Sequence, residues 1–94
     1  MADAEHTRQA ELTAIAGLQF LAADEQLLSR FVALSGVDPA RLREAAREPA
    51  FLAGVLDFFL NHEPTLLRFA EAAEIDPQTI VAARELLAGE ADRP

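Results

Sequence analysis

Apolar residues recur along the chain three or four positions apart, the spacing that places them on one face of an α-helix. No stretch shows the alternation of apolar and polar residues, rich in valine, isoleucine, threonine and aromatics, that a half-exposed strand requires. The pattern therefore predicts an all-α fold, a compact bundle of about six short helices.

Prolines and capping residues indicate where the helices begin and end. Proline is tolerated in the first turn because its missing N–H would have no partner there. Asp38 and Asp76 precede prolines, so their carboxylates are expected to accept hydrogen bonds from the first free N–H groups. Gly36 is expected to end a helix in the left-handed conformation. The prolines that open apolar runs are Pro39, Pro49, Pro64 and Pro77.

These signals divide the chain into helices expected at residues 4–23, 24–36, 38–47, 49–61, from about 63, and 76–88. The last helix is expected to end at Gly89, with residues 90–94 as a frayed tail. The side chains expected to face the core are Leu12, Ile15, Leu18, Leu21, Leu27, Phe31, Leu34, Leu42, Ala45, Ala46, Leu66, Phe69, Ala70, Ala73, Ile80, Ala83 and Leu87.

The chain matches itself after a shift of 38 positions. The matching residues are apolar anchors and helix caps, which determine how a chain folds and perform no chemistry. Two three-helix copies, residues 11–48 and 49–86, are fewer than an open solenoid needs, so we expect them to pack together as one domain over residues 1–94. The matched pairs are Leu18/Leu56, Phe20/Phe58, Leu28/Leu66, Arg30/Arg68, Phe31/Phe69, Val37/Ile75, Asp38/Asp76 and Pro39/Pro77.

Charge limits the classes of partner and compartment. Sixteen acidic residues against eight arginines give a formal net charge of −8, and this overall field repels nucleic acid and anionic membranes. The uncharged run at residues 12–23 is too short to span a bilayer and follows acidic residues rather than the basic residues of an export signal. We expect a soluble cytoplasmic protein with no membrane association.

The residues needed for catalysis or metal binding do not occur in the required patterns. The chain has no cysteine and no glycine-rich phosphate loop, and neither Ser29 nor Ser35 lies near a glycine elbow or a histidine. His62 stands beside acidic residues, but a metal site needs three or four ligands and the other histidine, His6, lies in the N-terminal segment. We expect no enzyme activity, no cofactor and no metal, and a surface or capping role for His62.

The predicted helix at residues 49–61 is apolar on nearly every face, with Asp57 as its single charge. Such a helix must be surrounded, either by the other helices or by a partner chain. The partner chain is an alternative because a domain this small rarely covers one helix fully. Phe58 and Phe59 project about 100° apart and should not fill the same pocket. The candidate interface residues are Phe51, Leu52, Phe58 and Phe59.

An alternative function comes from the segment FVALSGVDPARLREAAR, which has the pattern of a DNA-binding helix-turn-helix. In this alternative the helix from Asp38 to Arg47 presents Arg41, Arg43 and Arg47 to DNA. The second copy, FAEAAEIDPQTIVAARE, weakens the alternative because glutamate replaces the turn glycine and Arg84 is its single base.

The segments FLAADEQLLSRFVALSGVDP and VLDFFLNHE resemble a family of short bacterial proteins, mostly alphaproteobacterial, that is known as a domain of unknown function. The resemblance runs from about Leu12 to Leu87. It implies a stand-alone, cytoplasmic helical protein, and it brings no activity, ligand or catalytic residue.

The sequence therefore favours a non-enzymatic, acidic protein-interaction domain that binds another protein, or a second copy as a homodimer, through apolar surface near residues 49–61. The alternative is the helix-turn-helix DNA-binding protein. A continuous basic face at Arg41, Arg43 and Arg47 would favour DNA, whereas an apolar patch bordered by acidic residues would favour a protein partner.

Replacing either capping aspartate tests these helix boundaries. Asp38→Ala and Asp76→Ala should each lower the free energy of unfolding by about 0.5–2 kcal/mol, because each removes an acceptor for helix N–H groups. Chemical denaturation of both variants measures the loss. NMR chemical shifts that place either aspartate inside a continuous helix would contradict the assignment.

Overall fold

A computed structural model describes residues 2–93, and this part of the chain contains six α-helices and one short 3-10 helix. The all-α fold predicted from the sequence is confirmed. The helices are α1 (Ala2–Ala22), α2 (Glu25–Ser35), α3 (Leu42–Ala45), α4 (Pro49–Leu60), α5 (Glu63–Ala73) and α6 (Pro77–Ala91), and the 3-10 helix η1 (Pro39–Arg41) leads into α3.

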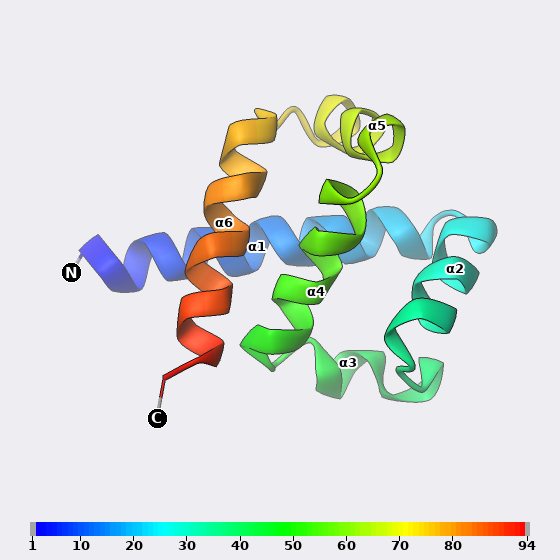
Figure 1. The fold of residues 1–94 in the computed structure, drawn as a ribbon, viewed down its shortest axis with the longest axis horizontal. Helices are drawn as coiled ribbons and strands as arrows, with labels where there is room; N and C mark the ends of the chain where they lie inside the picture. The colour runs from blue at the N-terminus through cyan, green and yellow to red at the C-terminus, as the bar shows by residue number, and fades with distance from the viewer. Residues whose placement is uncertain (1, 94) are drawn as a thin grey trace.

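Helix α4 lies at the centre of the arrangement. Figure 1 shows α4 and α6 side by side and antiparallel, with both crossing α1. Helix α2 lies on the side of α4 opposite to α6, and η1 and α3 return the chain from α2 to the start of α4. Because α1, α2 and α6 surround α4, its apolar residues are needed on several faces, as its sequence indicated.

The predicted capping residues occupy their expected positions. The Oδ1 atoms of Asp38 and Asp76 accept hydrogen bonds from the N–H groups of Ala40 and Gln78 at 3.0 and 2.8 Å. Asp24 caps α2 in the same way. Gly36 ends α2 in the left-handed region with φ of 73°, which a residue without a side chain adopts at little cost.

The predicted helix at residues 38–47 is shorter and less regular than expected. The chain forms η1 and then one short α-helical segment, α3, which ends at Ala45. Pro49 disfavours the helical conformation of the residue before it, and Glu48 is extended with φ of −95° and ψ of 123°. The helix therefore stops before Pro49, and its predicted inward residues Leu42, Ala45 and Ala46 are half-buried.

Helix α6 is longer than predicted. It continues through Gly89 to Ala91, so the predicted frayed tail at residues 90–94 begins too early. The hydroxyl of Thr7 donates a hydrogen bond to Oε1 of Glu90 at 3.3 Å and joins the end of α6 to α1. Pro94, the last residue of the predicted tail, lies outside the described residues.

Leu12 and Leu34 are the predicted core residues that the structure places on the surface, with exposed fractions of 49% and 75%. On α1, the buried positions near Leu12 are the small residues Ala10 and Ala14. The other predicted core residues are buried or half-buried.

Several features of the structure follow the 38-residue shift seen in the sequence. Helices α2 and α5 begin and end at positions that differ by this shift, and so do the ends of α1 and α4. The ring of Phe31 lies 5.6 Å from that of Phe58, and the shifted pair, Phe69 and Phe20, has the same centroid distance of 5.6 Å. The duplication itself stays a prediction, but these contacts place α2 on α4 and α5 on α1.

Phe59 and Phe69 form the centre of the core. Both are almost fully buried, and their rings stack with centroids 4.5 Å apart and an interplanar angle of 26°. They lie against the backbone of α1 at Gly17, where a Cβ atom would be 2.9 Å from Cε2 of Phe59. Real Cβ atoms almost never come this close to another heavy atom, so a larger residue here would force the stacked rings to shift.

Two glycine variants measure this close approach. Gly54, inside α4, has nothing within 4 Å of the position of a Cβ atom, so Gly54→Ala should raise the free energy of unfolding by about 0.5–1 kcal/mol through helix propensity. Gly17→Ala gains the same propensity but forces the phenylalanine stack to move. The difference between the two variants in chemical denaturation should be about 1–3 kcal/mol. Equal stabilities would contradict this account of the core.

Candidate functional site

The four predicted interface residues of α4 lie on different faces of the helix. Phe59 and Leu52 are 0% and 1% exposed in the core, so in this fold they present no surface to a partner. Phe58 and Phe51 are half-buried and line a groove on the other side of α4. The separation follows from helix geometry, because Phe58 and Phe59 project about 100° apart.

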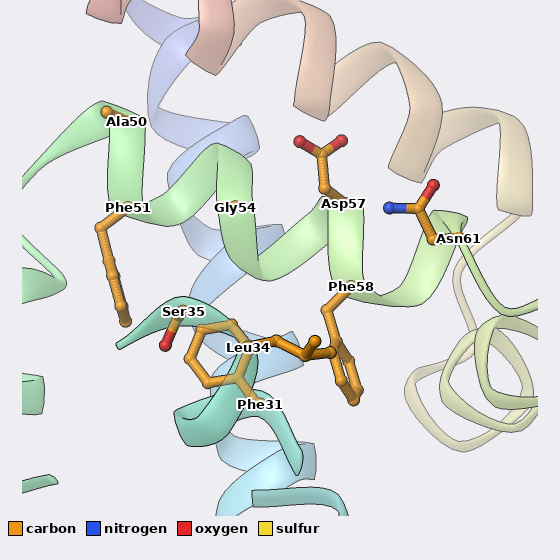
Figure 2. Close-up of a pocket in the computed structure, with 9 residues that line it drawn as sticks. All are labelled: Phe31, Leu34, Ser35, Ala50, Phe51, Gly54, Asp57, Phe58 and Asn61. Carbon is orange, nitrogen blue, oxygen red and sulfur yellow. The ribbon is translucent and has the colours of Figure 1, made fainter. Parts of the chain in front are cut away.

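The groove is a hollow of about 460 Å³ between α2 and α4. Figure 2 shows Phe51 and Phe58 reaching from α4 toward α2, with the ring of Phe31 between them. The Phe31 ring is edge-on to both, at centroid distances of 5.7 Å to Phe51 and 5.6 Å to Phe58. The nine lining residues are Phe31, Leu34, Ser35, Ala50, Phe51, Gly54, Asp57, Phe58 and Asn61.

This groove is shaped by two residues that the sequence pattern did not identify as interface residues. Gly54 lies on α4 between Phe51 and Phe58, and because it has no side chain the groove stays open along the helix surface. Leu34 extends from α2 beside Phe58 and is 75% exposed. The apolar spacing of α2 predicted Leu34 in the core, since spacing shows that a residue is apolar but not whether a neighbouring helix covers it.

The polar edge of the groove contains an ion pair. Asp57 and Asn61 point away from the three phenylalanines in Figure 2. Nε of Arg84 on α6 donates a hydrogen bond to Oδ1 of Asp57 at 2.8 Å. This hydrogen bond and the charge of Asp57 raise the pKa of Arg84 above its usual value. The ion pair joins α4 to α6.

The other groups considered from the sequence form no chemical centre. The hydroxyl of Thr65 and Nδ1 of His62 are 2.6 Å apart and share a hydrogen bond at the start of α5. Within residues 2–93, no group of three histidine, cysteine, aspartate or glutamate side chains has an arrangement that would hold a metal ion. Among the same residues, every helix is too short or too polar to cross a bilayer.

The arginines of the helix-turn-helix alternative lie on, or just after, a short helical segment. The segment that contains them is η1 followed by the four-residue helix α3, whereas a recognition helix lies along the major groove. Nη1 of Arg41 pairs with Oε2 of Glu44 in the same segment at 3.2 Å. Arg43 lines a second hollow, and Arg47 is exposed after the end of α3.

This second hollow lies between α1 and the η1–α3 segment and has a volume of about 760 Å³. Its walls are mostly apolar, and Arg43 and Gln19 are the polar residues at it. The half-buried residues Leu18 and Leu42 line it, whereas their counterparts after the 38-residue shift, Leu56 and Ile80, are both fully buried. The α1–α3 contact is therefore less tightly closed than the α4–α6 contact.

A comparison of the chain with known protein families identifies a matching family. The model of the family described as "Protein of unknown function (DUF3572)" matches residues 7–90. No curated protein matches the chain, and no solved structure matches it. The match agrees with the resemblance seen in the sequence and supplies no activity.

Two variants distinguish the exposed edge of the groove from the core beneath it. Leu34→Gln should change the free energy of unfolding by less than about 0.5 kcal/mol, because the side chain is largely in solvent and glutamine has a similar helix propensity. Phe31→Ala should cost about 3–5 kcal/mol, because it empties the contact between α2 and α4. Urea denaturation of both measures the contrast. A large loss of unfolding free energy in Leu34→Gln would show that Leu34 stabilises the fold.

Proposed function

The chain belongs to the DUF3572 family of proteins of unknown function, and we propose that this member is a non-enzymatic protein-interaction domain. In this proposal another protein chain docks in the groove between α2 and α4. The observation that carries it is the apolar surface formed by the exposed Leu34 beside the half-buried Phe51 and Phe58.

The surface has the composition of a docking site. A leucine that is 75% exposed contributes little to the stability of the isolated domain, and removing it from water in a complex is favourable by about 25 cal/mol per Å² of apolar surface. Aromatic side chains form the walls, and residues of this kind are enriched at protein interfaces.

Electrostatics favours protein over DNA as the partner. The net charge of −8 opposes binding to a phosphate backbone. The segment that contains Arg41 and Arg43 is short, and Arg41 is paired with Glu44. We therefore propose the protein-interaction function in place of the helix-turn-helix alternative.

Matched glutamate variants test the proposed groove. Gly54→Glu places a charge in the groove, and Gly89→Glu places the same charge on α6, where the position of a Cβ atom also has nothing within 4 Å. We expect affinity capture from the protein's own host to recover the same partner with wild type and Gly89→Glu, and to lose it with Gly54→Glu. Circular dichroism should show all three proteins folded.

Sedimentation of wild type and both variants completes this test. A dimer that Gly54→Glu alone converts to a folded monomer would identify a second copy in the groove. A monomeric wild type whose captured partners are all retained by Gly54→Glu would contradict the proposed function, because the docking surface would then lie elsewhere.

A further inference from the structure

We infer that the chain docked in the groove between α2 and α4 is an amphipathic helix of a different protein, with apolar residues on one face and arginines or lysines on its flanks. The inference rests on the proposed function and specifies the chemistry of its partner. Two observations support it, the shape of the groove and the distribution of charge.

The groove has the form that accepts a helix. It follows α4 from Ala50 to Asn61, a distance of about 16 Å at 1.5 Å per residue, or three helical turns. Residues 2–93 contain no strand, so the described part of the domain offers no sheet edge to which an extended peptide would add. Docking of an amphipathic helix, with anchors at positions i, i+3 or i+4 and i+7, is the recognition mode that fits such a surface.

The anchors of the partner have a defined place in the groove. Gly54 leaves space beside the α4 backbone, and Phe51 and Phe58 rise on either side of it. Because the Phe31 ring already lies between these two rings, an apolar side chain of the partner enters beside Gly54 and contacts the rings from outside. Leu34 then covers the same helix from α2, which removes its exposed surface from water.

Charge selects a cationic partner. The chain carries sixteen acidic residues and eight arginines, and the arginines that pair with its own acids are Arg41, Arg68, Arg84 and Arg93. The excess is therefore negative. Asp57, the charged residue that lines the groove, is already paired with Arg84, so the attraction comes from the acidic excess of the whole chain. A helix with basic flanks is attracted by this field.

The same charge disfavours a second copy of the chain as the occupant. Each copy carries a net charge of −8, so two copies repel each other as they approach, over a screening length of about 8 Å at physiological salt. Like charges at an interface suppress association. A basic amphipathic helix has no such cost.

Three synthetic helical peptides of about 14 residues test the inference, each labelled with fluorescein for anisotropy titrations. The first has leucines at i, i+3, i+4 and i+7 and lysines or arginines on its flanks. The second replaces the basic residues with glutamate, and the third replaces the leucines with serine. We expect wild type to bind the first peptide at least about tenfold more tightly than either control.

The glutamate variants separate docking in the groove from diffuse attraction. Each adds one negative charge, so attraction without a defined site would be strengthened by both. We expect Gly54→Glu to weaken the binding of the basic amphipathic peptide at least about tenfold, because docking would bury the carboxylate of the new glutamate among aromatic rings. Gly89→Glu should bind that peptide as wild type does, or slightly more tightly. Increasing salt should weaken the binding of this peptide to wild type and to Gly89→Glu.

Each of the other outcomes overturns a specific part of the inference. Wild type binding the basic and acidic peptides equally, while Gly54→Glu binds neither, would overturn the expectation of a cationic partner. The proposed groove function would remain intact. Binding of the basic peptide that Gly54→Glu does not weaken would overturn the groove as its site. Failure of all three peptides to bind wild type, or a wild-type dimer that Gly54→Glu dissociates, would overturn the inference directly.

Discussion

The fold depends on the contact between Gly17 of α1 and the stacked rings of Phe59 and Phe69. The stack lies so near the α1 backbone that a methyl group at Gly17 would come within 2.9 Å of the Phe59 ring. This contact holds α4 and α5 on α1. Because cores are packed to the density of crystals, helices that meet here cannot shift separately, and the remaining elements take their positions around this centre.

The same helix supplies both the core and the candidate interface. Successive residues of an α-helix point about 100° apart, so Phe59 enters the core while Phe58 lines the groove with Phe31. The core fixes how α4 is rotated, and this rotation determines which of its phenylalanines a partner can reach. A docking surface built on a rigid helix needs little ordering on binding, which reduces the entropic cost of association.

The two halves of the chain differ in how their third helical segment packs. In the second half, α6 continues for 15 residues and joins α4 through the 2.8 Å hydrogen bond between Arg84 and Asp57. In the first half, the approach of Pro49 ends α3 at Ala45, and a hollow of about 760 Å³ separates this segment from α1. The asymmetry places the well-packed core near α4 and α6, and it leaves the side occupied by α2 and α3 more open.

The sequence by itself determined the helical class, the capping aspartates, the glycine turn at Gly36 and the division of Phe58 from Phe59, because spacing and local hydrogen bonding fix these features within a few residues. It predicted a helix at residues 38–47, which is shorter and begins as a 3-10 helix. It also placed Leu34 and Leu12 in the core, and this placement was wrong. Apolar spacing identifies the face of a helix that can be buried, but the neighbouring helix decides whether it is. Only the tertiary structure therefore showed that Leu34, Gly54 and Phe58 lie together, since they come from two helices that meet through the core beneath them.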